Sequence, residues 1–179
     1  YFTAGVRYGG PCFPHDNIAF EELAKRADTT APLARASEKI NQTHTDWVFN
    51  AIQELTPPGG TVAVLGLSYK PEVPIVKESH GIKLVERISP EYETIAYDAV
   101  ATDAAAASLD TVSGLKLTDD FGEALDGAET AVITLQGSKI TEAESYEDIN
   151  LVDPWRVFEP GELGESVTYV PLGRGTTHD

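Results

Sequence analysis

The sequence contains no methionine and only one cysteine among its 179 residues. A single cysteine excludes an internal disulfide framework. The four histidines are dispersed and the Cys/His spacing of a structural zinc site is absent, so we expect no metal site. No apolar run approaches the length of a membrane span and no signal peptide is visible. We therefore expect a cytoplasmic protein without a membrane partner.

Basic residues are also scarce. The chain has 13 Lys and Arg against 29 Asp and Glu, which gives a formal net charge of -16. Such a surface repels nucleic acids and anionic membranes, so we exclude both as partners. The acidic residues are scattered along the chain, which is consistent either with adaptation to high salt or with an ordinary acidic cytoplasmic protein.

Two further absences suggest that the sequence is a piece of a longer protein. The chain opens with Tyr1, although a translation product begins with methionine. A trimmed start of an otherwise whole protein is the competing explanation. In addition, no G-x-G-x-x-G motif follows a predicted strand, because Gly66 and the upstream pair Gly59-Gly60 lack the required spacing. The fingerprint that binds the pyrophosphate of NAD is therefore missing from this sequence.

The sequence predicts an α/β protein with a helical amino-terminal segment. Residues 1–16 are rich in Gly and Pro and predict a loop, followed by a helix over 17–28 that Asp16 or Asn17 would cap. Apolar residues at helical spacing predict a second helix over 32–55, which would span ~36 Å and act as a connector or an oligomer contact.

The breaker Thr56-Pro57-Pro58-Gly59-Gly60 divides the chain, in this interpretation, into a central helical region (1–57) and a second domain (58–179). After it, apolar strands alternate with helices, which predicts a Rossmann-like, doubly wound parallel sheet. We expect strands at 61–67, 92–97, 115–117, 129–135, 150–152 and 166–170, and helices at 79–88, 99–108 and 120–125.

The most informative motif is Gly9-Gly10-Pro11-Cys12-Phe13-Pro14-His15-Asp16. We expect Cys12 at the start of a helix, where free N–H groups and the helix dipole stabilise a thiolate. Asp16 lies one turn further on, on the same face, and could position or deprotonate a water molecule. His15 could donate a proton or stabilise an oxyanion. The alternative is a lone buried cysteine beside a helix cap.

This motif resembles the active-site motif of the UDP-glucose/GDP-mannose 6-dehydrogenase family. Two further stretches match that family in the same order: residues 62–71 (VAVLGLSYKP) followed by 76–79 (VKES), and the pair Tyr97-Asp98. The segment 152–156 (VDPWR) is a weaker match. The resemblance implies an enzyme that oxidises the C6 alcohol of a nucleotide sugar to a carboxylate with two molecules of NAD. It also implies that the NAD domain precedes Tyr1.

The resemblance implies a role for each matching residue. Cys12 corresponds to the nucleophile that forms a thiohemiacetal and then a thioester, and Asp16 to the carboxylate that assists water. His15 stands where the family carries lysine, so its role in oxyanion stabilisation is open. The residues matched to substrate binding are Tyr1, Gly5, Tyr8, Gly9, Gly10, Tyr69, Lys70 and Arg156, the last of which can come from a neighbouring subunit. Lys77 stands where an arginine approaches NAD.

Other departures leave the nucleotide sugar undetermined. The family's Thr-Asp-Asp after Lys-Pro is replaced by Val73-Pro74-Ile75, and its Trp-x-Glu-Phe segment is missing after residues 132–135. Our principal hypothesis is a part of an NAD-dependent dehydrogenase, inactive alone, that dimerises through the long helix. Two alternatives stay open: a non-catalytic nucleotide-sugar-binding or assembly module, and a redox-responsive single-cysteine protein.

Overall fold

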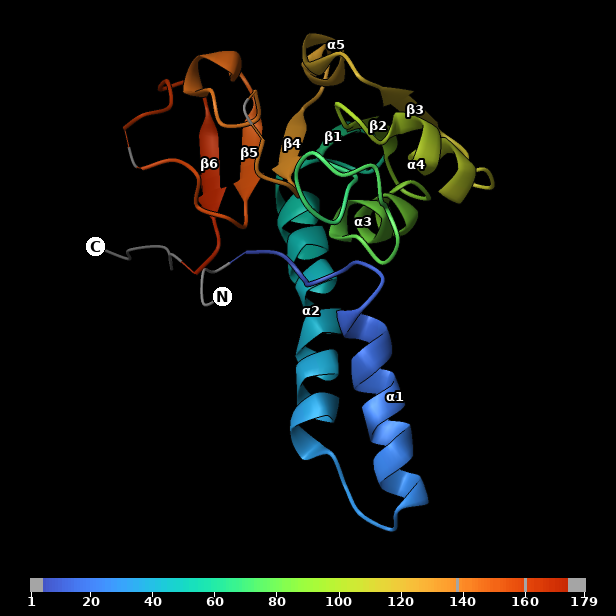
Figure 1. The fold of residues 1–179 in the computed structure, drawn as a ribbon. Coiled ribbons are helices and arrows are strands. Elements are labelled where there is room, and N and C mark those ends of the chain that lie inside the picture. Colours follow the sequence, from blue (N-terminus) through green and yellow to red (C-terminus); the bar gives the residue numbers. More distant parts are fainter. Residues whose placement is uncertain (1–4, 138, 160, 174–179) are drawn as a thin grey trace, which may run out of the picture.

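The computed structural model describes residues 5–137, 139–159 and 161–173, and Tyr1 lies outside these ranges. A hairpin of two helices, α1 (Phe13–Arg26) and α2 (Pro32–Leu55), projects from an α/β unit, and the upper part of α2 runs into that unit (Figure 1). The expected long helix is confirmed at both ends, and Pro32 lies in its first turn, where the missing N–H costs nothing.

The α/β unit is a six-stranded parallel sheet, which confirms the predicted fold class. The strand order is β3-β2-β1-β4-β5-β6, so the topological switch point lies between β1 and β4. The remaining elements are β1 (Thr61–Leu65), α3 (His80–Ile88), β2 (Glu93–Tyr97), α4 (Thr102–Ser108), β3 (Leu115–Thr118), α5 (Phe121–Leu125), β4 (Thr130–Ile133), η1 (Ala143–Ser145), β5 (Asn150–Asp153) and β6 (Thr168–Pro171).

Both faces of the sheet are covered, which explains the uninterrupted apolar runs of its central strands. Val62 and Val64 of β1 belong to a core cluster shared with α2 and α3, whereas Ala63 and Leu65 belong to a second cluster on the opposite face. The carboxyl-terminal half of α2 is part of the first cluster. Because α2 is built into this core, the division of the chain near residue 57 stays a prediction.

Several expected boundaries are wrong in detail. Helix α1 begins at Phe13 rather than at residue 17, because Pro14 suits a first helical turn, and Cys12 rather than Asp16 or Asn17 occupies the cap position. Strand β1 ends at Leu65 because Gly66 adopts a φ of 113°. Strand β4 ends at Ile133, and β6 begins two residues later than expected.

Candidate functional site

The carboxyl ends of the strands face a cavity of about 890 Å³. The loop that precedes α1 crosses below these strand ends (Figure 1), and residues 5–9 of this loop line the cavity. Ligands in doubly wound sheets bind at this edge, outside the switch point. The lining residues come from the loop, from α1, α2 and the start of α3, and from the segments after β1, β4 and β5.

Glycines allow this loop to pack directly against the sheet domain. A Cβ at Gly5 would lie 2.4 Å from the ring of Trp155, and one at Gly9 would lie 2.2 Å from the carbonyl oxygen of Glu78. Gly10 adopts a φ of 87°, and a Cβ there would lie 2.6 Å from the ring of Tyr69. The chain itself therefore occupies the space that these glycines leave open, and Gly5 and Gly9 also line the cavity.

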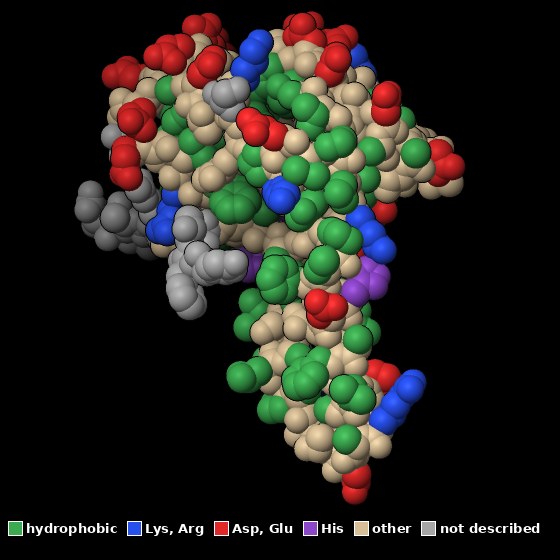
Figure 2. Space-filling view, in the orientation of Figure 1, with side chains coloured by type: hydrophobic (Ala, Val, Ile, Leu, Met, Phe, Trp, Pro, Cys, Tyr) green, Lys and Arg blue, Asp and Glu red, His purple; other side chains and the backbone are tan. Residues whose placement is uncertain are grey.

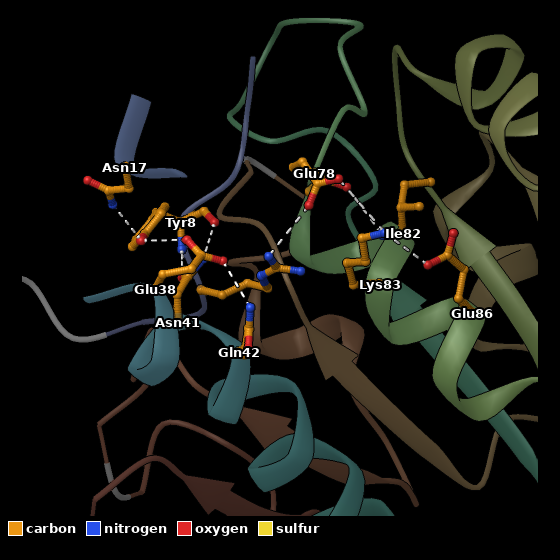
Figure 3. Close-up of polar contacts among 11 residues, drawn as sticks. Tyr8, Asn17, Glu38, Asn41, Gln42, Glu78, Ile82, Lys83 and Glu86 are labelled. Carbon is orange, nitrogen blue, oxygen red and sulfur yellow. Dashed lines mark hydrogen bonds and ion pairs between the residues drawn. The ribbon is translucent and has the colours of Figure 1, made fainter. Parts of the chain in front are cut away.

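Tyr8 fixes the loop to the hairpin (Figure 3). Its backbone N–H donates to Oδ1 of Asn41 at 2.7 Å, and its carbonyl accepts from Nδ2 of the same residue at 3.0 Å. The Tyr8 hydroxyl donates to Glu38 at 3.0 Å and accepts from Asn17 at 2.9 Å. Burial, with the Glu38 carboxylate adding to it, raises the pKa of Tyr8 against the opposing effect of the Asn17 bond. The buried side chain of Asn41 thus binds both the N–H and the carbonyl of Tyr8 and holds the loop in place. The sequence did not predict this role.

The three residues expected to be catalytic, Cys12, His15 and Asp16, lie at the start of α1. Cys12 is an exposed free thiol at the amino-terminal cap of the helix, as predicted, and its carbonyl accepts the N–H of Asp16 at 2.9 Å. His15 and Asp16 are also exposed. The described part of the cavity wall includes Phe13 next to them but none of these three side chains. The interpretation of Cys12 as a buried, inert cysteine is therefore wrong.

Tyr69 and Lys70 line the cavity from the segment that follows β1. The Lys70 ammonium lies 5.5 Å from the centroid of the Tyr69 ring. Buried Asp98, at the end of β2, fixes the start of this segment, since its Oδ2 accepts the N–H groups of Leu67 and Ser68, both at 2.8 Å. The side chain of Ser68 donates to the same oxygen at 2.7 Å.

Asp153, at the end of β5, likewise fixes the segment that follows its strand. Its carboxylate accepts the N–H of Trp155 at 2.9 Å and that of Val157 at 2.6 Å. Trp155 lines the cavity, but Arg156 is exposed, with a φ of 53°, and does not line it. Lys77 is exposed as well, and only its carbonyl reaches the loop, where it accepts the N–H of Gly10 at 2.9 Å.

Two cavity residues escaped the sequence interpretation. Arg7 is 9% exposed, and its Nη2 lies 3.6 Å from Glu78. His80 is 3% exposed. Burial, followed by the charges of Arg7 and His44, lowers the pKa of His80 to about 3. His44 of α2 also lines the cavity. In the sequence, the only indication of such a role was the position of Arg7 within a glycine-rich loop.

Comparison with known families shows to which family the chain belongs. Residues 63–160 match the UDP-glucose/GDP-mannose dehydrogenase family, UDP binding domain, and residues 1–43 match the central domain of that family. The chain belongs to the UDP-glucose/GDP-mannose dehydrogenase family. The resemblance inferred from the cysteine motif and the segment after β1 is thereby confirmed, in the expected order along the chain.

The individual relatives are longer than this chain. A UDP-glucose 6-dehydrogenase of Pseudomonas aeruginosa is 28% identical over 188 residues, which cover 97% of this chain and 42% of that one. The UDP-glucose 6-dehydrogenase YwqF of Bacillus subtilis is 29% identical and is covered to 34%. The structure of a UDP-glucose dehydrogenase from Pyrobaculum islandicum superposes with a TM-score of 0.84 at 24% identity, over 95% of this chain and 39% of that one. The chain thus spans about two fifths or less of these relatives.

None of the helices in the described ranges combines the length and the apolar character needed to cross a membrane.

Proposed function

We propose that this chain is the central and nucleotide-binding part of an NAD-dependent nucleotide-sugar 6-dehydrogenase of the cytoplasm. One observation carries the proposal: the loop that lines the cavity at the strand ends leads directly into Cys12 at the amino terminus of α1. A sugar nucleotide bound in the cavity would have its reacting end near this helix. The named activity of the relatives supports the same assignment.

The described residues do not fit NAD itself. The N–H groups of Leu67 and Ser68, which follow β1, already donate to Asp98. The space beside Gly66 is filled, since a Cβ there would lie 2.1 Å from that of Leu135. A pyrophosphate could not approach this turn as it does in a dinucleotide-binding fold. We therefore assign the binding of the hydride acceptor to a part of the protein outside this chain.

The chain's own residues support the covalent steps. In our proposal the Cys12 thiolate adds to the carbon of the C6 aldehyde, and the carbonyl oxygen takes up a proton to give a thiohemiacetal. Once that carbon, still bound to the Cys12 sulfur, has lost a hydride and its hydroxyl group a proton to give a thioester, water would attack the thioester carbonyl, the C–S bond would break and Cys12 would leave as the thiolate. Asp16, one turn along α1, would accept the proton of the attacking water, and His15 would stabilise the oxyanion.

Other residues would bind the substrate. Tyr69 would stack on the nucleobase and Lys70 would contact a phosphate or hydroxyl group, while the loop at Gly5, Tyr8, Gly9 and Gly10 would wrap the sugar and pyrophosphate. Arg156 and Lys77 lie outside the cavity. They can act only in a neighbouring subunit or against the NAD-binding part, and Tyr1 lies outside the described residues.

A homodimer through the long helix belongs to the same proposal. Six of the eight large apolar side chains that are exposed in the described structure lie on the hairpin: Phe13, Ile18, Phe20, Leu23, Leu33 and Ile40. Figure 2 shows apolar side chains over the hairpin, while acidic ones gather at the opposite end of the molecule. Because four of these residues lie on α1 and two on α2, a second copy would bury this surface if it packed along α1 as well as along the long helix α2.

Calorimetric titration of the chain with UDP-glucose, GDP-mannose, UDP and GDP tests the proposal. We expect binding of one nucleotide sugar, no turnover when NAD is added, and turnover only when the remainder of the protein is restored. Binding without turnover in the restored protein would favour the alternative, a non-catalytic binding module. Failure to bind any of the four, together with a Cys12 thiol that does not react with a thiol reagent, would contradict both the enzyme and the redox-responsive alternative.

A further inference from the structure

The cavity differs in charge from the rest of this acidic molecule. Its described lining contains no Asp or Glu, although the chain has 29 of them. The wall contains instead the cations Arg7 and Lys70 and the histidines His44 and His80. An acid-free, partly cationic cavity in a protein of net charge -16 is suited to an anion, which the remaining surface would repel.

Three side chains of this wall carry buried nitrogens that form no hydrogen bond with any of the described residues. Arg7 Nε, both ring nitrogens of His80 and Nε1 of Trp155 are buried and have no hydrogen-bond partner among the described residues. A buried donor without a partner destabilises a fold, so most are paired. The ion pair between Arg7 and Glu78 is made through Nη2, and it leaves Nε unused.

The glycine-rich loop brings these three side chains together. Arg7 lies between Gly5, which packs on the Trp155 ring, and Gly9, which packs on the backbone of Glu78 just before His80. The influence of Arg7 on His80 places the two groups within electrostatic reach. We call Arg7, His80 and Trp155 the donor wall.

Resting on the function proposed above, we propose that the donor wall binds the diphosphate of the nucleotide sugar. Arg7 Nε and Trp155 Nε1 donate to phosphate oxygens, as does one ring nitrogen of His80, while its second nitrogen accepts from a sugar hydroxyl. These nitrogens are covered in the unliganded chain, so the ligand reaches them by rotating the side chains. The donor wall therefore determines specificity for a diphosphate-linked substrate.

The test compares binding with stability, because the two should move in opposite directions. The wild-type chain, Arg7→Met, His80→Leu and Trp155→Phe are titrated with UDP, inorganic pyrophosphate and uridine. We expect each variant to bind UDP about tenfold more weakly, with binding of uridine unchanged. Without ligand, His80→Leu should melt at a higher temperature than the wild type, since it removes two unpaired buried nitrogens. Lys116→Met, which removes a cation remote from the cavity, is the matched control and should bind UDP normally.

The possible results separate this inference from the proposed function. Wild-type binding of UDP that the three variants retain would overturn the donor wall and leave the nucleotide-sugar site in place. Binding of pyrophosphate that the variants lose, without binding of any nucleotide, would support the donor wall and contradict the proposed function. If the wild type binds neither UDP nor pyrophosphate, both are wrong. A lower melting temperature for His80→Leu would assign His80 to packing and overturn its part.

Discussion

Acidification should destabilise this protein through His80. In the folded chain the pKa of this side chain is lowered to about 3, chiefly by burial, from the ordinary value of 6.5 that we assume for the unfolded chain. Below pH 6.5 the unfolded chain therefore binds a proton at His80 that the folded chain does not. The contribution to stability is complete above pH 6.5 and is lost as the pH falls toward 3.

The two pKa values set the size of the effect. Each pH unit below 6.5 removes about 1.4 kcal/mol from the free energy of unfolding, so lowering the pH from about 8 to about 5 should remove about 2 kcal/mol through this one group. Other groups titrate over the same range, and protonation of the many carboxylates changes the self-repulsion of the chain. The difference between the wild type and His80→Leu isolates the contribution of His80.

Urea unfolding at pH 8, 6.5 and 5, followed by the fluorescence of Trp47 and Trp155, measures this difference. The wild type should lose about 2 kcal/mol more than His80→Leu between pH 8 and pH 5, at equal slopes against urea. His15→Leu, which removes an exposed histidine of α1, is the control for the loss of a histidine as such. Parallel pH profiles for the wild type and His80→Leu would refute the reasoning, because they would mean that His80 takes up its proton equally in both states.

Three further predictions concern the scaffold and the surface. Asp98→Asn replaces one acceptor oxygen with an NH₂ group that faces backbone donors, so at least two bonds to the charged carboxylate are lost. The urea midpoint should fall by an amount equivalent to about 3 kcal/mol, and a wild-type midpoint would contradict the role of Asp98. Gly81→Ala should cost about 1–3 kcal/mol, since its Cβ would lie 2.0 Å from the carbonyl oxygen of Gly66. Gly164→Ala, where the nearest atom lies at 4.0 Å, should unfold like the wild type, and equal losses at both sites would refute the packing argument. If the charge of -16 reflects adaptation to salt, molar NaCl should raise the urea midpoint, whereas a midpoint insensitive to salt would count against that hypothesis.

The fold was predictable because its signals are local. The bounds of α2 follow from Pro32 and from the spacing of its apolar residues, and the parallel sheet follows from short apolar runs that alternate with helices. Helix α3 was expected over 79–88 and begins one residue later, because Ser79 caps it by accepting the N–H of Ile82. The start of α1 was misplaced because Asp16 and Asn17, both good capping residues, were given more weight than Pro14. A proline in the first turn is an equally informative signal of a helix start.

The site was only half predictable, because its other half depends on contacts between distant segments. Cys12 and Tyr69 belong to motifs that the sequence displays. Arg7, His80 and Asn41 belong to none, and they meet in the cavity only when the loop lies across the strand ends. The glycines illustrate the same limit. Their pattern indicates close approach of a backbone, but only the fold tells that the approaching groups include the ring of Trp155.

Two aspartates at strand ends hold the cavity wall in place, because their carboxylates accept backbone N–H groups of the segments that form it. Asp98 and Asp153 use their carboxylates to fix the segments after β1 and β5, and both segments contribute to the cavity wall. Because Asp98 takes the N–H groups that a dinucleotide-binding fold offers to pyrophosphate, those N–H groups are not available to an anion in the cavity, and the proposed donor wall would supply donors from side chains instead. Those side chains come from the loop before α1, from the start of α3 and from the segment after β5, so a ligand that contacts all three would fix the loop against the α/β unit. The same loop ends at Cys12, and binding at the sheet would thereby position the thiol on the hairpin.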